Sequence, residues 1–258
     1  MRESPSEIRK AIRATRELWI RSRKATKQYE RLLKGVAYQV GSIVSGIAPN
    51  GVVDETNSSA LHETLRAYAE LLRPWAVLTA SRMIAEVGQR DKNAWLSMGK
   101  EIGRSLNKEI ESSPTGPAMK ALLDEQVTLI TSLPIQASKR VHELTMKGLV
   151  EGGRAKSIAE EIMRTEHVTK SRAVLIARTE VARTGSILSQ VRAEHLGSTQ
   201  YTWRTVGDSD VRALHKHLNG QVFSWDNPPV AGSNGEHANA GQIYNCRCFA
   251  EPILPELE

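Results

Sequence analysis

Helical periodicity runs through most of this 258-residue chain and limits the possible fold more than any other feature. From the first residues to about residue 196, apolar residues recur three or four positions apart, with charged residues between them. Alternation typical of a half-buried strand begins only at residues 200–206, where Tyr201 and Trp203 alternate with Thr202 and Arg204. The sequence therefore predicts a mainly α fold, with a long N-terminal helical region followed by a small α+β C-terminal module.

Glycines, prolines and polar runs divide the helical pattern into segments. We expect helices at residues 4–34, at 58–107 with an interruption at Pro74, from the 112–117 break to Pro134, and at 135–148, 157–163 and 170–196. Residues 35–57, with several glycines, are expected to be irregular. Gly197 should end the last long helix in a left-handed conformation. A short helix at 210–218 and strands at 221–225 and from Cys246 should follow. The expected domains are a basic helical arm and irregular segment at 1–57, a helical body at 58–197, and the small module at 198–258.

Positive charge is concentrated at the N-terminus. Residues 1–34 contain eleven Lys and Arg against four Glu, whereas the whole chain carries +6, so the remainder is close to neutral. Such an arm indicates an anionic partner, either nucleic acid or an acidic protein surface, although a merely solvated helix face is an equal alternative. No apolar run is long enough to span a membrane, and the N-terminus lacks a secretory signal, so we expect synthesis in the cytoplasm.

Residues with possible chemical roles gather between positions 178 and 248. Arg212 and His215 are three residues apart and would share a helix face, while Asp208 could cap that helix. Asn219 and Gly220 form a turn signal because both tolerate positive φ. The full set that we single out is Arg178, Glu180, Asp208, Arg212, His215, Gly220, Cys246, Arg247 and Cys248.

Cys246, Cys248 and His215 could be three ligands of a structural zinc site. The fourth ligand would be Asp208, His217 or His237. A single residue between the cysteines fits common zinc motifs poorly, so the alternative is that both thiols pack as small apolar groups beside a hydrogen-bonded His215. A disulfide closing so small a loop would be strained, which favours reduced thiols.

The order of these signals resembles the phage Mu F-like family of minor head, or head morphogenesis, proteins. The residues that carry the resemblance are Ile176-Ala177-Arg178-Thr179-Glu180, Gly197, Trp203, Asp208, Arg212, His215, Gly220-x-Val222-Phe223, Pro228-Pro229 and Asn245-Cys246-Arg247-Cys248. The resemblance covers roughly the second half of the chain, and the loop at 231–242 is longer than the family pattern needs.

The resemblance implies a non-enzymatic component of the virion, associated with the portal or the capsid interior of a tailed phage. Such a protein would be present in several copies per head, would bind the portal protein, the major capsid protein or both, and would join during procapsid assembly in the host cytoplasm. It could also take part in DNA packaging or ejection. The alternative function is a nucleic-acid-acting enzyme, such as a nuclease or transferase, that uses His215, Arg212 and Asp208.

Overall fold

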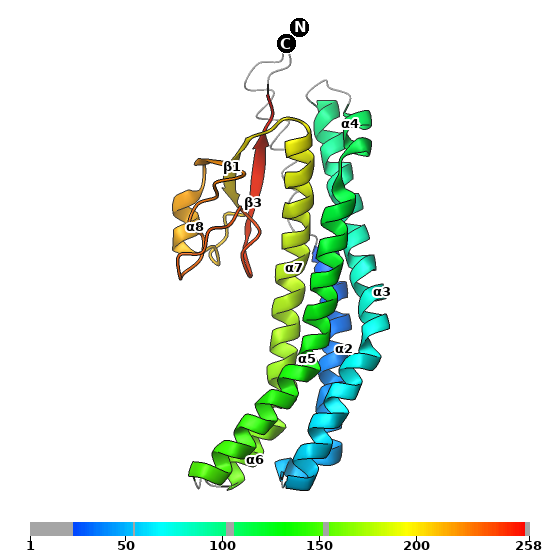
Figure 1. Cartoon of the computed structure of the whole chain (residues 1–258). Coiled ribbons are helices and arrows are strands. Elements are labelled where there is room, and N and C mark those ends of the chain that lie inside the picture. Colours follow the sequence, from blue (N-terminus) through cyan, green and yellow to red (C-terminus); the bar gives the residue numbers. More distant parts are fainter. Residues whose placement is uncertain (1–22, 54, 102–105, 152–154, 256–258) are drawn as a thin grey trace. The chain divides into compact units, whose positions relative to one another are not determined.

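The structure is a computed structural model that describes residues 23–53, 55–101, 106–151 and 155–255. Its elements are α2 (Arg23–Ile47), η1 (Pro49–Gly51), α3 (Glu55–Glu101), α4 (Asn107–Ser112), α5 (Thr115–Glu151), α6 (Ala155–Met163), α7 (Thr165–His195), β1 (Gln200–Thr205), α8 (Ala213–Leu218), β2 (Val222–Ser224) and β3 (Cys248–Ile253) (Figure 1). The mainly α fold with a small α+β C-terminal module is confirmed. Most of the predicted basic arm, residues 1–22, lies outside the described residues.

The predicted irregular segment at 35–57 is wrong over its first part, because α2 continues to Ile47. Val36, Val40 and Val44 are buried at helical spacing along it, and this packing outweighs the helix-weakening effect of the glycines. A side chain at Gly41 would collide with Glu166 of α7, so this glycine permits a close approach of two helices. The chain turns only at η1, where Asn50 and Gly51 adopt φ values of 60° and 72°.

The predicted breaks at Pro74 and Pro134 are also wrong. Both prolines lie inside continuous helices, α3 and α5. Proline inside a helix costs about 3 kcal/mol. Buried residues continue in helical register on both sides, at Leu72 and Ala76 and at Leu133 and Ala137, and their packing offsets that cost. The break predicted at 112–117 is confirmed, since α4 ends at Ser112 and α5 begins at Thr115.

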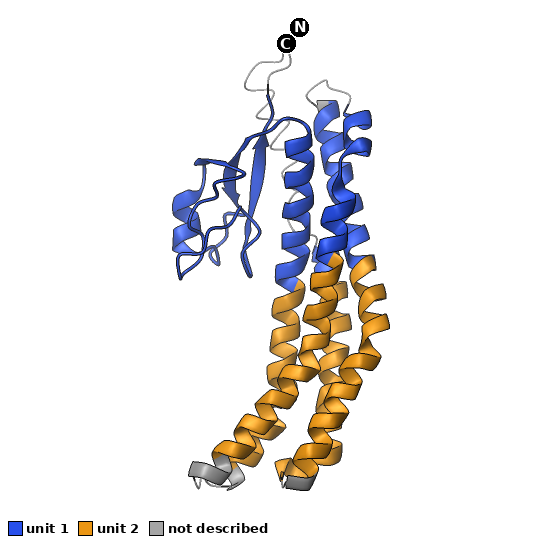
Figure 2. Cartoon of the chain, viewed as in Figure 1, with its two compact units in different colours: residues 1–26, 82–122, 178–258 blue, residues 27–81, 123–177 orange. Residues whose placement is uncertain are grey.

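The contacts group the chain into two compact units, which are coloured blue and orange in Figure 2. Unit 2 contains residues 27–81 and 123–177, and unit 1 contains residues 1–26, 82–122 and 178–258. Unit 2 is helical, and its core joins α2, α3, α5 and α6 through Val40, Val44, Leu61, Leu65, Ala137, Val141 and Ile162. The predicted domain limits at residues 57 and 197 remain a prediction.

Unit 1 holds the C-terminal module, whose three-stranded antiparallel sheet has the order β2-β1-β3. The register pairs Tyr201 with Phe223 on one side, and Trp203 with Ala250 on the other. Tyr201 and Trp203 are fully buried, which confirms the predicted alternation of β1. They share one core with Trp95, Met98, Ile110 and Ala193 from α3, α4 and α7, so the sheet is packed against helices of its own unit.

The end of α7 follows the sequence prediction. The helix stops at His195, and Gly197 takes a φ of 82°, in the left-handed region that glycine adopts without strain. Of the helices that the structure describes, none has an apolar stretch long enough to cross a bilayer.

Candidate functional site

Three buried side chains from separate segments meet in the C-terminal module. His215 lies on α8, Cys248 begins β3, and Cys246 precedes that strand in the loop. Nδ1 of His215 lies 3.6 Å from Sγ of Cys246 and 3.4 Å from Sγ of Cys248. All three residues are less than a tenth exposed, and both thiols are free, as the sequence predicts. The fold therefore gathers one imidazole and two thiols around a single point.

The ring of His215 is held from its other side. Nε2 lies 2.9 Å from the carbonyl oxygen of Ala231, so it carries the proton and donates it there. Trp203 meets the ring edge-on, with centroids 5.3 Å apart. This arrangement leaves Nδ1 with its lone pair directed at the two thiols.

The thiols influence each other's protonation. The hydrogen bond with Cys248 lowers the pKa of Cys246 well below its usual range, and neighbouring His215 adds to this effect while burial opposes it. The same hydrogen bond and burial raise the pKa of Cys248. Burial alone would lower the pKa of His215, but its hydrogen bonds to Cys246 and Ala231 raise it overall. Of the two thiols, Cys246 therefore loses its proton more readily than Cys248.

Helix α7 fixes the loop that carries these cysteines. The backbone N–H of Asn245 donates to Oγ1 of Thr179 at 2.9 Å, and Oγ of Ser186 donates to the carbonyl of Ala240 at 2.7 Å. Gln190 continues this row and accepts a 2.8 Å hydrogen bond from the side chain of Gln242. Thr179, Ser186 and Gln190 are seven and four residues apart, so they lie on one helix face. The sequence analysis missed Ser186 and Gln190, although a polar stripe at this spacing was visible.

Two of the three arginines of the motif, Arg212 and Arg247, hold loop segments in place. Arg212 donates to the carbonyl of Tyr244 at 3.0 Å and stacks over the ring of the same residue at 4.5 Å. Arg247 pairs with Asp208 and, at 3.1 Å, with Asp210. Arg247 thus ties the loop between the cysteines to the segment before α8.

Two predictions about this segment are wrong. Arg212 precedes α8 with extended backbone angles, so it does not share a helix face with His215. Asp208 makes no cap to α8, since its carboxylate binds Arg247 instead. Both predictions assumed a helix from residue 210, whereas α8 begins only at Ala213.

The predicted Asn219-Gly220 turn is present but joins a helix to a strand. Gly220 has a φ of 87°, and the N–H of Gln221 donates to the carbonyl of Leu218 at 3.0 Å. Asn219 keeps a negative φ and accepts a hydrogen bond from the N–H of Thr205 at 3.0 Å through Oδ1. The turn therefore links α8 to β2 and ties both to β1.

The remaining motif residues lie away from the thiols. Arg178 is exposed on α7, while Glu180 is buried and pairs with Arg183 at 3.4 Å. His217 is exposed on α8, and His237 is exposed with Nδ1 2.7 Å from the carbonyl of Pro228. Within the described part of the chain, only the His215, Cys246 and Cys248 ligand atoms form a group lying within 4.8 Å of one another.

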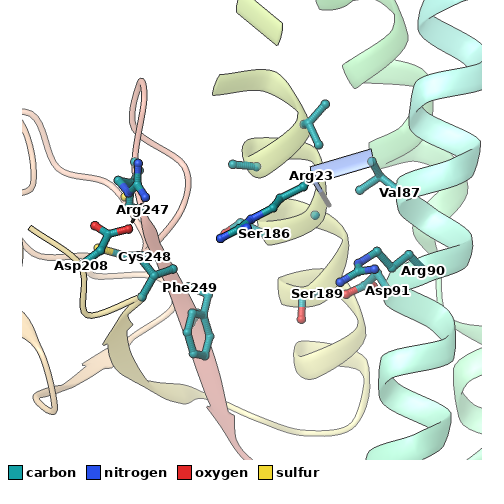
Figure 3. A pocket seen from close by; sticks show the side chains of 16 residues that line it. Arg23, Val87, Arg90, Asp91, Ser186, Ser189, Asp208, Arg247, Cys248 and Phe249 are labelled. Atoms are coloured by element: carbon teal, nitrogen blue, oxygen red, sulfur yellow. Dashed lines mark hydrogen bonds and ion pairs between the residues drawn. The ribbon is translucent and has the colours of Figure 1, made fainter. Parts of the chain in front are cut away.

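A cavity of about 310 Å³ borders the two cysteines (Figure 3). Asp208 and Arg247 lie on the same side of it as Cys248, while Arg90, Asp91, Ser186 and Ser189 come from α3 and α7. Asp91 forms a buried ion pair with Arg192, and burial raises the pKa of Asp91 to about 7 against the opposing effect of that guanidinium. Oδ1 of Asp208 is buried and has no hydrogen-bond partner among the described residues. The cavity thus combines thiol, carboxylate and guanidinium groups.

Comparison with known proteins gives one family model that matches part of the chain. Residues 139–251 match the family model described as "Phage Mu protein F like protein". Over these residues the chain is similar to the phage Mu F-like family. The Mu F-like region contains α6, α7, the first two strands, the His215, Cys246 and Cys248 cluster, and most of β3.

A second comparison gives a relative from Haemophilus influenzae that is described only as an uncharacterized protein. It is 27% identical over 205 residues, which cover 78% of this chain and 45% of the relative. The chain therefore spans less than half the length of that relative. A search of the solved structures gives no match.

Proposed function

We propose that this chain is a minor head protein of a tailed phage, a structural virion component that is built in during head assembly. The observation that carries the proposal is the Mu F-like region at residues 139–251, which includes most of the C-terminal module. The residues that carry the resemblance to head morphogenesis proteins include His215, Cys246 and Cys248, which lie together in the structure.

The geometry supports a docking role for the module. Arg212, Arg247 and Thr179 each use their polar groups on loop backbone or on neighbouring side chains. His215 is 1% exposed, and its Nε2 is engaged by a carbonyl oxygen. These interactions hold a loop-rich module in one conformation, which is what a rigid binding surface requires.

The proposed partners are the portal protein, the major capsid protein or both, with several copies of the chain per head. DNA is a further proposed partner, through the basic arm at residues 1–34. In the described part of that arm, Lys24, Lys27 and Arg31 are exposed on α2 at helical spacing, while Tyr29 and Leu33 are buried. A basic face of this kind binds phosphates with an affinity that falls as salt rises.

Deletion and complementation in the encoding phage or prophage test the proposal. We expect deletion to reduce infectious particles and the full chain, supplied in trans, to restore them. Unchanged titres after deletion, together with heads that lack the chain, would contradict a role in head assembly.

A matched pair of variants separates the partners. Replacement of Lys24, Lys27 and Arg31 by Gln should reduce DNA retention while the chain still enters heads. Replacement of exposed Lys139 by Gln, on α5, is the control. Equal DNA retention in the triple variant and the control would show that the described part of the arm does not bind DNA.

A further inference from the structure

The buried cluster of His215, Cys246 and Cys248 has the geometry of a metal site. We infer that it binds Zn²⁺ through Nδ1 of His215 and the two Sγ atoms, with a fourth coordination position that faces the cavity and holds water. This inference goes beyond a head-assembly function, because it assigns a metal and an exchangeable ligand to the module.

The distances between donor atoms match those of a tetrahedral ion. Zinc–sulfur and zinc–nitrogen bonds of about 2.3 and 2.05 Å at the tetrahedral angle place sulfur and nitrogen about 3.6 Å apart. The two observed sulfur–nitrogen distances are 3.6 and 3.4 Å. An ion can therefore enter between the three donors with little movement of the side chains.

His215 is oriented as metal-binding histidines usually are. Such residues donate the other ring N–H to a carbonyl or carboxylate, which fixes the tautomer and the ring. Here Nε2 donates to Ala231, itself buried, and Trp203 holds the ring edge. Nδ1 is left free of a proton and directed at both sulfur atoms.

The local backbone explains how cysteines with only one residue between them serve one ion. Residues two apart in an extended chain point to the same side, so Cys246 and Cys248 face His215 while Arg247 turns away to Asp208 and Asp210. Asn245 takes a φ of 47° directly before this stretch and is held by Thr179. Two thiolates and an imidazole are the donor types that select zinc.

The cavity supplies the fourth position. Both cysteines line it, and about 310 Å³ is ample room for a bound water. Asp208 lines the same cavity, and its Oδ1, which has no partner among the described residues, can accept a hydrogen bond from that water. His217 and His237 are exposed and lie outside the cluster, so neither completes the coordination.

Metal analysis of the purified full chain tests the three protein ligands. After zinc loading and desalting we expect one zinc per chain, lost in Cys246→Ser, Cys248→Ser and His215→Gln but retained in the controls His217→Gln and His237→Gln. Wild-type chain without zinc, or zinc that survives all three ligand substitutions, overturns the inference.

Because a ligand variant can fail to fold, the wild-type chain provides a second measurement. Titration with a mercurial should release the zinc in step with modification of the two thiols. If the two thiols react fully with the mercurial before a chelator is added and no metal is released, the cluster is a hydrogen-bonded thiol pair and not a metal site.

Cobalt substitution tests the open position. The Co²⁺ form should show thiolate charge transfer and tetrahedral d–d bands that shift when thiocyanate is added. Asp208→Asn should weaken zinc binding about 10–100-fold, the usual effect of removing a group that supports a metal ligand, whereas the exposed control Asp226→Asn should not. Co²⁺ absorption bands that do not shift when thiocyanate is added, together with an unchanged zinc affinity in Asp208→Asn, would overturn the inference of a water-filled fourth position.

Discussion

Trp203 is the side chain on which the stability of the C-terminal module should depend most. It is fully buried on β1 and meets His215 and Phe223 edge-on, with centroids 5.3 and 6.2 Å apart. Replacement of a buried aromatic residue by Ala costs about 3–5 kcal/mol. Edge-to-face pairs contribute about 0.5–1.5 kcal/mol each beyond burial. We therefore expect Trp203→Ala to lose about 4–5 kcal/mol, in the upper part of that range.

The loss can be measured by thermal unfolding followed by near-UV circular dichroism. For a chain of this size, each kcal/mol lowers Tm by about 2–4 °C, so the expected fall is about 8–20 °C. Tyr244→Ala is the matched control. Its ring is half exposed and stacks only under Arg212, which is worth about 0.5–1 kcal/mol. A Trp203→Ala variant within about 1 kcal/mol of wild type would refute the described packing of the module.

Three further predictions concern single positions. Gly51→Ala should destabilise unit 2 by about 1–2 kcal/mol or more, because φ is +72° and a Cβ would collide with the backbone of α6. Gly35→Ala, in open space on α2, should instead stabilise the protein by about 0.5–1 kcal/mol. Urea unfolding of both variants measures the two effects, and equal effects would contradict the prediction. Thr179→Val should lower the free energy of unfolding by about 1–3 kcal/mol, because the N–H of Asn245 loses its acceptor. The buried thiols should also react faster in this variant. Unchanged stability and thiol reactivity would contradict a role of Thr179 in holding the cysteine loop. Burial raises the pKa of Asp91 to about 7, so the folded state keeps a proton that the unfolded state releases near pH 4, and stability should fall as pH rises from about 4 to 7. Asp91→Asn should flatten that part of the pH–Tm profile, and an equally steep profile in the variant would contradict the assignment.

The sequence predicts those parts of the fold that depend on local periodicity. Tyr201 and Trp203 alternate with polar residues and form β1, and Gly197 ends α7 as expected. The sequence offered His215 with the two cysteines as one of two alternatives, and in the structure these three side chains do lie together. These predictions needed only the order and type of residues.

The sequence predicts less well what depends on contacts between distant segments. Pro74 and Pro134 stay in helices because buried residues on both sides pack in register, a contribution that local propensity does not contain. Arg212 and Asp208 bind loop partners more than thirty residues away, so a helix cap or a shared helix face was the wrong inference. The contacts of Ser186 and Gln190 were missed for the same reason.

The central claim, that the chain is built into phage heads, is tested most directly by cross-linking mass spectrometry of purified heads. The account predicts that the chain is present in every preparation of heads, with cross-links from residues of the Mu F-like region to the portal or major capsid protein. Heads of normal composition and full infectivity that contain none of the chain would contradict it.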